Sequence, residues 1–264
     1  MDYNKRIDGR DFDELRPMEA KAGIIKKAEG SGFFKMGNTV AYAAVYGPRE
    51  MFPKFKQDPK RGVLRCNYNM MPFSGAGERV RPGPSRRSKE ISAVTDKALS
   101  AVVDLYDSPN AVVDVYIELT QTDAGSRCCG INAAAIALAD AGIPMKDIVA
   151  AVAIGNAGNK IVVDLNYEEE HLPEFLEGLD NKDVADIPVA IIPSTGEITL
   201  LQMDGVVDKE TVIAASNKAK TAVLKINEVQ RSALREKFAI QASENGDAGD
   251  AAENGNGNAG FTEQ

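Results

Sequence analysis

The segment Thr122–Leu138 (TDAGSRCCGINAAAIAL) combines the residue types and the spacing that suit the binding of an anion. Gly125 permits a tight turn, Ser126 offers a hydroxyl group, and Arg127 offers a guanidinium fork that matches a phosphate. An apolar strand precedes this turn and an Ala-rich helix follows it, so the first N–H groups of the helix also face the anion. An ordinary strand-to-helix turn, with the arginine paired to a surface acid, is the alternative interpretation.

A second group of candidate residues lies in the acidic stretch 164–190. Asp186 directly precedes an apolar strand at 187–192, and Asp180 lies six residues before Asp186. Two such carboxylates are suited to share one Mg²⁺ ion, which prefers oxygen ligands, and one of them could act as a general acid. A solvated acidic loop is the alternative. We expect His171, the single histidine of the chain, to be a surface residue of this loop.

A third group is basic, with five Lys and Arg residues between positions 79 and 89. Arg86 and Arg87 begin a predicted helix after a loop rich in Gly and Pro, and Arg65 lies on the preceding predicted strand. Such residues suit contacts with a nucleic-acid backbone. The nearby Tyr68 and Phe73 could stack on bases. A solvated charged loop is again the alternative.

Periodicity and turn residues predict the elements that position these groups. We expect strands at 32–36, 40–46, 63–73, 111–119, 149–154, 161–165, 189–193 and 198–202, and helices at 85–105 (capped by Ser85), 131–141 and 209–238. This order predicts an α/β fold of the layered α+β kind. We divide the chain into an N-terminal arm (1–16), a first half (17–147), a second half (148–240) and a disordered acidic tail (241–264).

Composition limits the class of protein further. The 264 residues are 44% hydrophobic, enough for one compact unit of two packed halves. The net charge is −8, but a local basic patch can still bind nucleic acid. Three cysteines, two of them adjacent (Cys128 and Cys129), indicate neither a disulfide framework nor a zinc site. Without a signal peptide or an apolar run near about 18 residues, we expect no membrane span and a cytoplasmic protein.

Together, these features resemble the RNase PH family of phosphorolytic 3′→5′ exoribonucleases. Within that family, the chain is most similar to the catalytic ring subunits of archaeal exosomes. The resemblance covers about residues 5–240 and rests on Arg6–Arg10, Leu15-Arg16-Pro17 and the segments 37–50, 64–74, 84–92, 122–147 and 198–205.

The resemblance implies an RNase PH fold, related to a ribosomal-protein-S5-like unit. It implies that inorganic phosphate attacks the 3′-terminal phosphodiester of single-stranded RNA and releases nucleoside diphosphates, and that the reverse reaction adds 3′ tails. The implied partners are a homologous inactive ring subunit, alternating in a hexameric ring, and RNA-binding cap subunits. Carried over by motif, Gly125, Ser126 and Arg127 would bind phosphate. Arg86 and Arg87, and less directly Arg65, would bind RNA.

The chain departs from the family pattern in its acidic loop. About ten extra residues separate the strand end at Asp164 from Asp186, which matches the carboxylate that opens a strand in the family. Counting back from Asp186 gives Asp180 as the first carboxylate, whereas counting forward from Asp164 gives Glu170, and Asp183 is a third option. We favour Asp180, with Asp186, for the acid and Mg²⁺ site. The alternatives are an inactive RNA-guiding ring subunit, or a homomeric RNase PH that processes tRNA 3′ ends.

Overall fold

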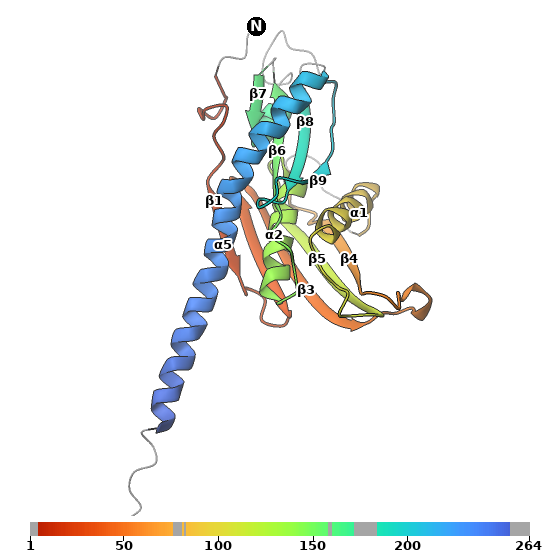
Figure 1. The fold of residues 1–264 in the computed structure, drawn as a ribbon. Helices are drawn as coiled ribbons and strands as arrows, with labels where there is room; N and C mark the ends of the chain where they lie inside the picture. Colours follow the sequence, from red (N-terminus) through yellow and green to blue (C-terminus); the bar gives the residue numbers. More distant parts are fainter. Residues whose placement is uncertain (1–4, 76–80, 82, 158–159, 172–183, 254–264) are drawn as a thin grey trace, which may run out of the picture.

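The computed structural model describes residues 5–75, 81, 83–157, 160–171 and 184–253, with the side chains of 240–253 left out of the description. Two sheets face a shared central helix (Figure 1). The first sheet has the order β1-β2-β3-β5-β4 and the second has the order β7-β6-β8-β9. Their strands are β1 Met18–Ala22, β2 Gly30–Met36, β3 Thr39–Glu50, β4 Val63–Met70, β5 Ala111–Gln121, β6 Ala150–Ala157, β7 Lys160–Val163, β8 Val184–Ile191 and β9 Ile198–Leu201. The helices are η1 Lys54–Lys56, α1 Arg86–Ser100, α2 Ser126–Asp140, α3 Tyr167–Glu170 and α5 Lys209–Glu253.

Helix α2 is the centre of the fold. It is apolar on all sides and packs against β2 and β3 of the first sheet and β6 of the second, as a fully buried helix should. Two glycines let β2 approach it closely: a Cβ atom at Gly30 would lie 2.2 Å from the Ala141 nitrogen, and one at Gly32 would lie 2.3 Å from the Ala133 oxygen. Because α2 is held from both sides, its N-terminus has a fixed place between the two sheets.

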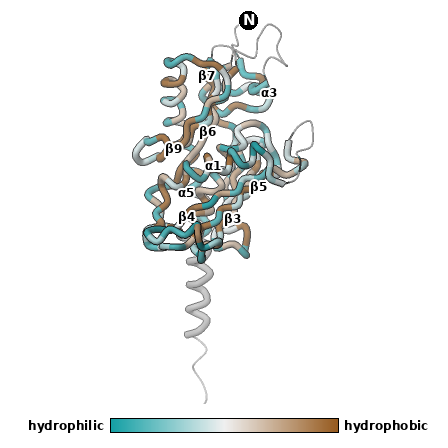
Figure 2. The backbone as a smooth tube through the Cα atoms, turned by 90° about the vertical axis from the view of Figure 1, so that its right-hand side faces the viewer, coloured by the Kyte–Doolittle hydropathy of each residue, from teal (hydrophilic) through white to brown (hydrophobic). Residues whose placement is uncertain are grey.

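Helix α5 runs along both sheets and packs against strands of each sheet and against α2 (Figure 1). Its buried face includes Val223 and Ile226, and the buried Gln230 side chain donates hydrogen bonds to the Asn132 and Val149 oxygens, at 3.2 and 3.0 Å. Hydrophobic segments run through the middle of the molecule, and hydrophilic segments lie mainly in the loops around it (Figure 2). No helix in the described part of the chain is long and apolar enough to cross a lipid bilayer.

Several predicted elements are confirmed. β2 and β3 match the predicted strands at 32–36 and 40–46 and form an antiparallel hairpin, with Met36 opposite Thr39 across the turn. Ser85 caps α1: its hydroxyl accepts a hydrogen bond from the Ser88 N–H, and the Ser88 hydroxyl accepts one from the Ser85 N–H. The layered α/β class is also confirmed, with two sheets and packed helices.

Four details of the prediction are wrong. Helix α2 begins at Ser126 rather than at Ile131, because the left-handed Gly125 forms its N-cap and the Gly-Ser-Arg segment is its first turn. β8 begins at Val184 rather than Val189, and β1 forms at Met18–Ala22, where we predicted no strand, because β2 offers it an edge. Helix α5 continues to Glu253 rather than ending at 238, and no proline interrupts this part of the chain.

Candidate functional site

The turn before α2 forms a cradle for an anion. Ala124 and Gly125 both have left-handed backbones, with φ of 53° and 59°, and no side chain caps the helix at Gly125. Successive N–H groups in such a turn point to one side and make a concavity suited to an anion. Ser126 and Arg127 open the helix there, and an Arg127 guanidinium nitrogen (Nη1) donates to the Gln202 Oε1 at 2.6 Å. This hydrogen bond orients the guanidinium group.

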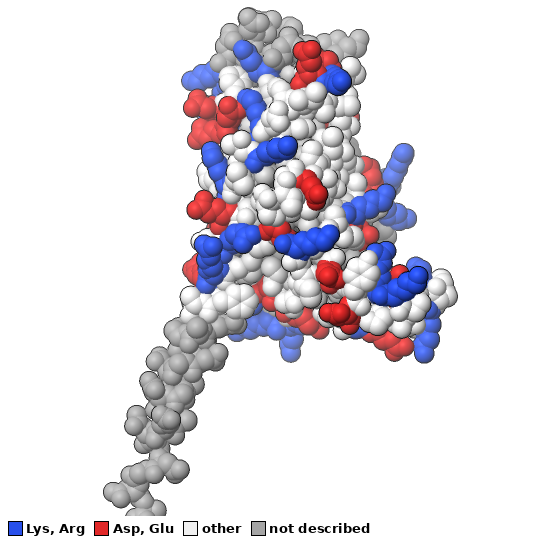
Figure 3. Space-filling model, in the orientation of Figure 1, with Lys and Arg blue, Asp and Glu red and all other residues white. Residues whose placement is uncertain are grey.

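The start of α1 lies on the other side of the same cleft. Ser85, Arg87 and Ser88 line it, so the capped helix N-terminus and one arginine face the anion cradle. Basic side chains also gather on the molecular surface around α1 (Figure 3). Arg86, the neighbouring arginine, is exposed and does not line the cleft. Of the two predicted helix arginines, the structure therefore brings one to the site.

Asp186 on β8 supplies a carboxylate to the cleft. Its backbone exchanges two hydrogen bonds with Asp204, at 2.9 and 2.8 Å, which fix its position. Its Oδ1 atom is shielded from solvent and has no hydrogen-bond partner among the described residues. Burial, followed by the nearby charge of Glu170, raises the pKa of Asp186 to about 7, although Arg127 opposes the shift. The carboxylate is therefore poised to change its charge near neutral pH.

Glu170 is the second carboxylate that lines the cleft. It ends α3, whose N-cap Asn166 forms a capping box with Glu169. Asp180 and Asp183, the other two candidates for the first carboxylate, lie outside the described residues. Of the three options left open by the sequence, Glu170 is the one whose position is described, and it faces Asp186.

These groups surround a cleft of about 320 Å³ between the two halves of the molecule. It is lined by Tyr68, Asn69, Met70, Gly75, Gly83, Ser85, Arg87, Ser88, Thr122, Ala124, Gly125, Ser126, Arg127, Tyr167, Glu170, His171 and Asp186. Three residues separated widely in sequence (Arg87, Arg127 and Asp186) thus reach one space. The cleft combines positive charge, a helix N-terminus and carboxylates, an arrangement suited to phosphoryl transfer.

Arg65 lies in a neighbouring groove that shares Tyr68, Asn69, Gly83 and Ser88 with the cleft. Its guanidinium group binds the buried carboxylate of Asp114, as does that of Arg49. Hydrogen bonding to Asp114 raises the pKa of Arg65, so it is a fixed positive charge. Its groove adjoins the cleft, but the guanidinium group is engaged within the protein.

The aromatic residues of the cleft differ from those expected. Tyr68 lines it but is only 3% exposed, whereas Phe73 is 74% exposed and does not line it. His171, which we expected at the surface, lines the cleft and stacks on Tyr167 with ring centroids 4.2 Å apart. Sequence reasoning missed Tyr167. The signal that could have found it is its position at the start of the acidic loop, two residues after the end of an apolar run.

The adjacent side chains of Cys128 and Cys129 pack in the core. Both are fully buried in α2 and neither forms a disulfide. Burial raises the pKa of Cys129 to about 12, and the same cause raises that of Cys128, so neither supplies a thiolate at neutral pH.

The fold and the cleft, with an anion cradle beside two carboxylates, suit a protein that acts on phosphate groups. Comparisons with known proteins identify the family. Residues 14–144 match domain 1 of the 3′ exoribonuclease family (RNase PH), and residues 147–222 match its domain 2. The chain therefore belongs to the RNase PH family of 3′ exoribonucleases.

Curated relatives are similar over nearly the whole chain. The exosome complex component Rrp41 of Thermoplasma volcanium is 45% identical over 244 residues, covering 92% of this chain and 94% of the relative. The protein of the same name from Thermococcus kodakarensis is 49% identical over 240 residues, covering 91% and 92%.

Two solved structures share the fold. Rice Rrp46 superposes with a TM-score of 0.75 at 24% identity, over 87% of this chain and all of the rice chain, which shows the fold alone. A chain of the Archaeoglobus fulgidus exosome with RNA bound to the active site gives a TM-score of 0.68 at 27% identity, over 89% of this chain and 93% of that chain.

Proposed function

We propose that this chain is a phosphate-dependent 3′→5′ exoribonuclease and the catalytic subunit of an exosome ring. The observation that carries the proposal is the convergence of the Ser126–Arg127 cradle, Arg87 and Asp186 on one cleft. The relatives named Rrp41, the family and the exosome structure with bound RNA support the same conclusion. An inactive ring subunit has no need of a phosphate cradle beside a carboxylate.

In this mechanism, inorganic phosphate occupies the cradle before α2. The Ser126 hydroxyl, the Arg127 guanidinium and the first N–H groups of the helix hold it in line with the last phosphodiester of the RNA. A phosphate oxygen forms a bond to the phosphorus atom, and the bond to the 3′-oxygen of the preceding nucleotide breaks. A nucleoside diphosphate leaves and the shortened RNA regains a 3′-hydroxyl group. The reverse reaction extends RNA from nucleoside diphosphates.

The basic residues around the cleft bind the RNA backbone. Arg87 neutralises the phosphates of the last nucleotides from within the cleft, and the exposed Arg86 contacts phosphates farther along the strand. Arg65, held by Asp114, presents a fixed charge in the neighbouring groove. Since backbone contacts carry little base information, sequence preference is weak.

The carboxylates complete the chemistry. The unpartnered Oδ1 of Asp186 and the carboxylate of Glu170 are oxygen ligands of the kind that Mg²⁺ prefers, so these residues fit that ion. Within the described residues, however, no group of three or more His, Cys, Asp or Glu side chains is placed to hold a metal ion. When bound, Mg²⁺ would stabilise the negative charge that develops on phosphate oxygens. A protonated carboxyl group of the pair delivers the proton to the leaving 3′-oxygen.

We expect Glu170→Gln to reduce phosphorolysis by about 10²-fold, because general acid–base groups typically contribute 10²- to 10⁴-fold. The matched variant Asp180→Asn tests Asp180, the residue that the sequence favours as the first carboxylate. Steady-state release of nucleoside diphosphate from a short oligoadenylate measures both. A large loss in Asp180→Asn with a small one in Glu170→Gln would assign the role to Asp180 instead.

The function itself is tested by phosphate dependence. Incubation of the chain with oligoadenylate RNA and Mg²⁺, alone and with a homologous ring subunit, should yield ADP in the presence of inorganic phosphate only. AMP released without phosphate would mean hydrolysis and would contradict the proposal. RNA binding without any product in the assembled ring would identify an inactive structural subunit.

The partners follow from the same proposal. Single-stranded RNA 3′ ends are the substrate, a homologous inactive RNase PH-like subunit alternates with this chain in a hexameric ring, and RNA-binding cap subunits sit on one face of the ring. The assembly works in the cytoplasm. Activity of the isolated chain as a homohexamer would instead favour a homomeric RNase PH.

A further inference from the structure

The N-terminal arm carries two charged motifs, Arg6–Arg10 and Leu15-Arg16-Pro17, that do not line the cleft. Several residues of these motifs are exposed, but one arginine of each motif is buried. Arg6 is 2% exposed and Arg16 is 5% exposed. Removing a guanidinium group from water costs several kcal/mol unless it is fully paired, so these two arginines need partners inside the fold.

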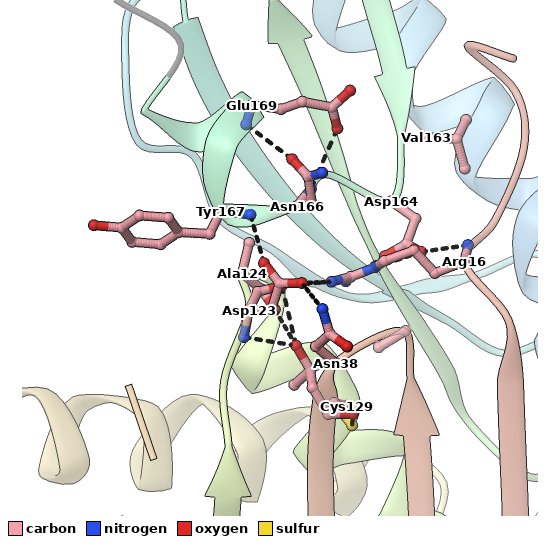
Figure 4. Close-up of polar contacts among 12 residues, drawn as sticks. Arg16, Asn38, Asp123, Ala124, Cys129, Val163, Asp164, Asn166, Tyr167 and Glu169 are labelled. Carbon is pink, nitrogen blue, oxygen red and sulfur yellow. Dashed lines mark hydrogen bonds and ion pairs between the residues drawn. The ribbon is translucent and has the colours of Figure 1, made fainter. Parts of the chain in front are cut away.

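Arg16 joins the two halves of the molecule (Figure 4). On one side, its Nε and Nη2 donate to both carboxylate oxygens of Asp164, at 3.0 and 2.7 Å, and its backbone N–H donates to Oδ2 at 2.8 Å. On the other side, its Nη1 donates to the backbone oxygen of Asp123. Asp164 follows β7 in the second half, and Asp123 follows β5 in the first, so one side chain connects the two segments that form the site.

Asp123 begins the turn that forms the anion cradle. The Thr39 hydroxyl donates to the Asp123 and Ala124 backbone oxygens, at 3.1 and 2.8 Å. The Arg16 guanidinium packs against Gly125, where a Cβ atom would lie 3.4 Å from the Arg16 Nη2. The Asp123 side chain also reaches the second half, where its Oδ1 accepts a hydrogen bond from the Tyr167 N–H at 2.9 Å. The left-handed backbone of the cradle is therefore held by contacts from the arm and from α3.

Arg6 holds the other wall of the cleft. Its Nε and Nη2 donate to the two carboxylate oxygens of Glu169, at 2.7 and 2.6 Å, and its Nη1 and Nη2 donate to the Val163 and Asp164 backbone oxygens, each at 2.9 Å. Glu169 is fully buried, and the next residue in the chain is Glu170, which lines the cleft. The arm thus fixes the direction in which α3 presents its carboxylate.

The geometry points to the N-terminal arm as a positioning element of the active site, in which Arg16 and Arg6 set the separation between the anion cradle and the carboxylate wall. This inference rests on the proposed function, since it assigns a catalytic consequence to that separation. Neither arginine touches substrate. They act through Asp123, Asp164 and Glu169, much as the groups behind a metal ligand orient it.

Arg16→Lys is the test. Lysine keeps the charge but lacks the planar fork, so it cannot hold Asp164 with two hydrogen bonds and also reach Asp123. We expect the KM for phosphate to rise and kcat to fall, giving a loss of about 10- to 100-fold in kcat/KM for phosphate. The KM for RNA should stay unchanged, because Arg87 on α1 is not held by the arm. In addition, hydrogen exchange of the amides at 123–127 and 167–170 should be faster than in the wild type.

Lys237→Met is the matched control. It removes a partly buried ion pair between α5 and Asp140 at the far end of α2, away from the cleft. It should lower thermal stability without changing the KM for phosphate or the exchange at 123–127 and 167–170. If Arg16→Lys fails to fold, Asp123→Ala replaces it, because this change removes the link to Tyr167 and leaves Arg16 paired with Asp164.

The outcomes separate this inference from the proposed function. Kinetics and amide exchange in Arg16→Lys that match those of Lys237→Met would overturn the positioning role, leaving Arg16 a merely structural residue. If the wild-type protein releases no nucleoside diphosphate with phosphate, the proposed function fails. The exchange measurement would still decide whether the arm holds the cradle and α3.

Discussion

Replacement of Arg127 by alanine is expected to reduce kcat/KM for phosphate by about 10²- to 10³-fold, the usual loss when one preorganised charge-stabilising donor is removed. The guanidinium group is the one positive side chain that follows the cradle directly on α2, and its hydrogen bond to Gln202 fixes its orientation. The loss should appear in both kcat and KM, because in the proposed mechanism Arg127 binds phosphate and stabilises the charge that develops on it. Initial rates at varied phosphate concentrations measure both constants.

A second readout for Arg127 does not depend on turnover. Phosphate that binds the folded state raises its thermal stability, so the wild-type midpoint should increase with phosphate concentration. That increase should largely disappear in Arg127→Ala. Lys97→Ala is the control, because Lys97 is an exposed charge near the end of α1 and does not line the cleft. An unchanged KM for phosphate in Arg127→Ala, or an undiminished thermal shift, would remove Arg127 from the phosphate site.

The sequence was sufficient for the parts of the site that depend on local chemistry. Gly125, Ser126 and Arg127 are consecutive, and the preference of glycine for a left-handed turn places them at a helix start without any knowledge of the rest of the fold. Arg87 and Asp186 were found in the same way, from a helix cap and from the start of a strand. Three points had to be corrected: α2 begins at Ser126 rather than Ile131, Asp186 lies inside β8 rather than before the strand, and Arg86 does not line the cleft.

The remaining parts depend on contacts between distant segments, which periodicity does not reveal. The Arg6–Glu169 ion pair joins residues 163 positions apart, and nothing in the local pattern of an apparently polar arm indicates that its arginines are buried. The first carboxylate was ambiguous for a related reason. Insertion of residues into a loop leaves the strand ends in place, and the spacing along the chain then no longer reports which acid faces the cleft.

Asp186→Asn is expected to stabilise the protein at pH 8 while greatly reducing its activity. The carboxyl group has an ordinary pKa of 3.8 in the unfolded chain and a pKa of about 7 in the folded one, chiefly because of burial. The folded state therefore binds the proton more tightly than the unfolded chain does. The stability that the wild type gains from this proton is fully present below pH 4 and is lost as the pH rises toward 7. At pH 8 the wild type bears a buried negative charge that Asn lacks. We therefore expect the free energy of unfolding of Asp186→Asn to exceed that of the wild type by roughly 2 to 4 kcal/mol.

The pH dependence distinguishes this cause from simple repacking. Urea unfolding at pH 4, 6 and 8 should show that the gain in Asp186→Asn is near zero at pH 4, grows through pH 6 and is largest at pH 8. Asp96 on α1 is the matched control: burial also raises the pKa of its carboxyl group, its Oδ1 also lacks a partner among the described residues, and it lies outside the cleft. Asp96→Asn should stabilise the protein in the same direction and keep phosphorolysis intact, whereas Asp186→Asn should lower it by at least about 10²-fold. If the gain in the free energy of unfolding of Asp186→Asn is equal at pH 4 and pH 8, the pKa of Asp186 is not raised. The conclusion that this carboxylate lowers stability at neutral pH while serving the activity would then be wrong.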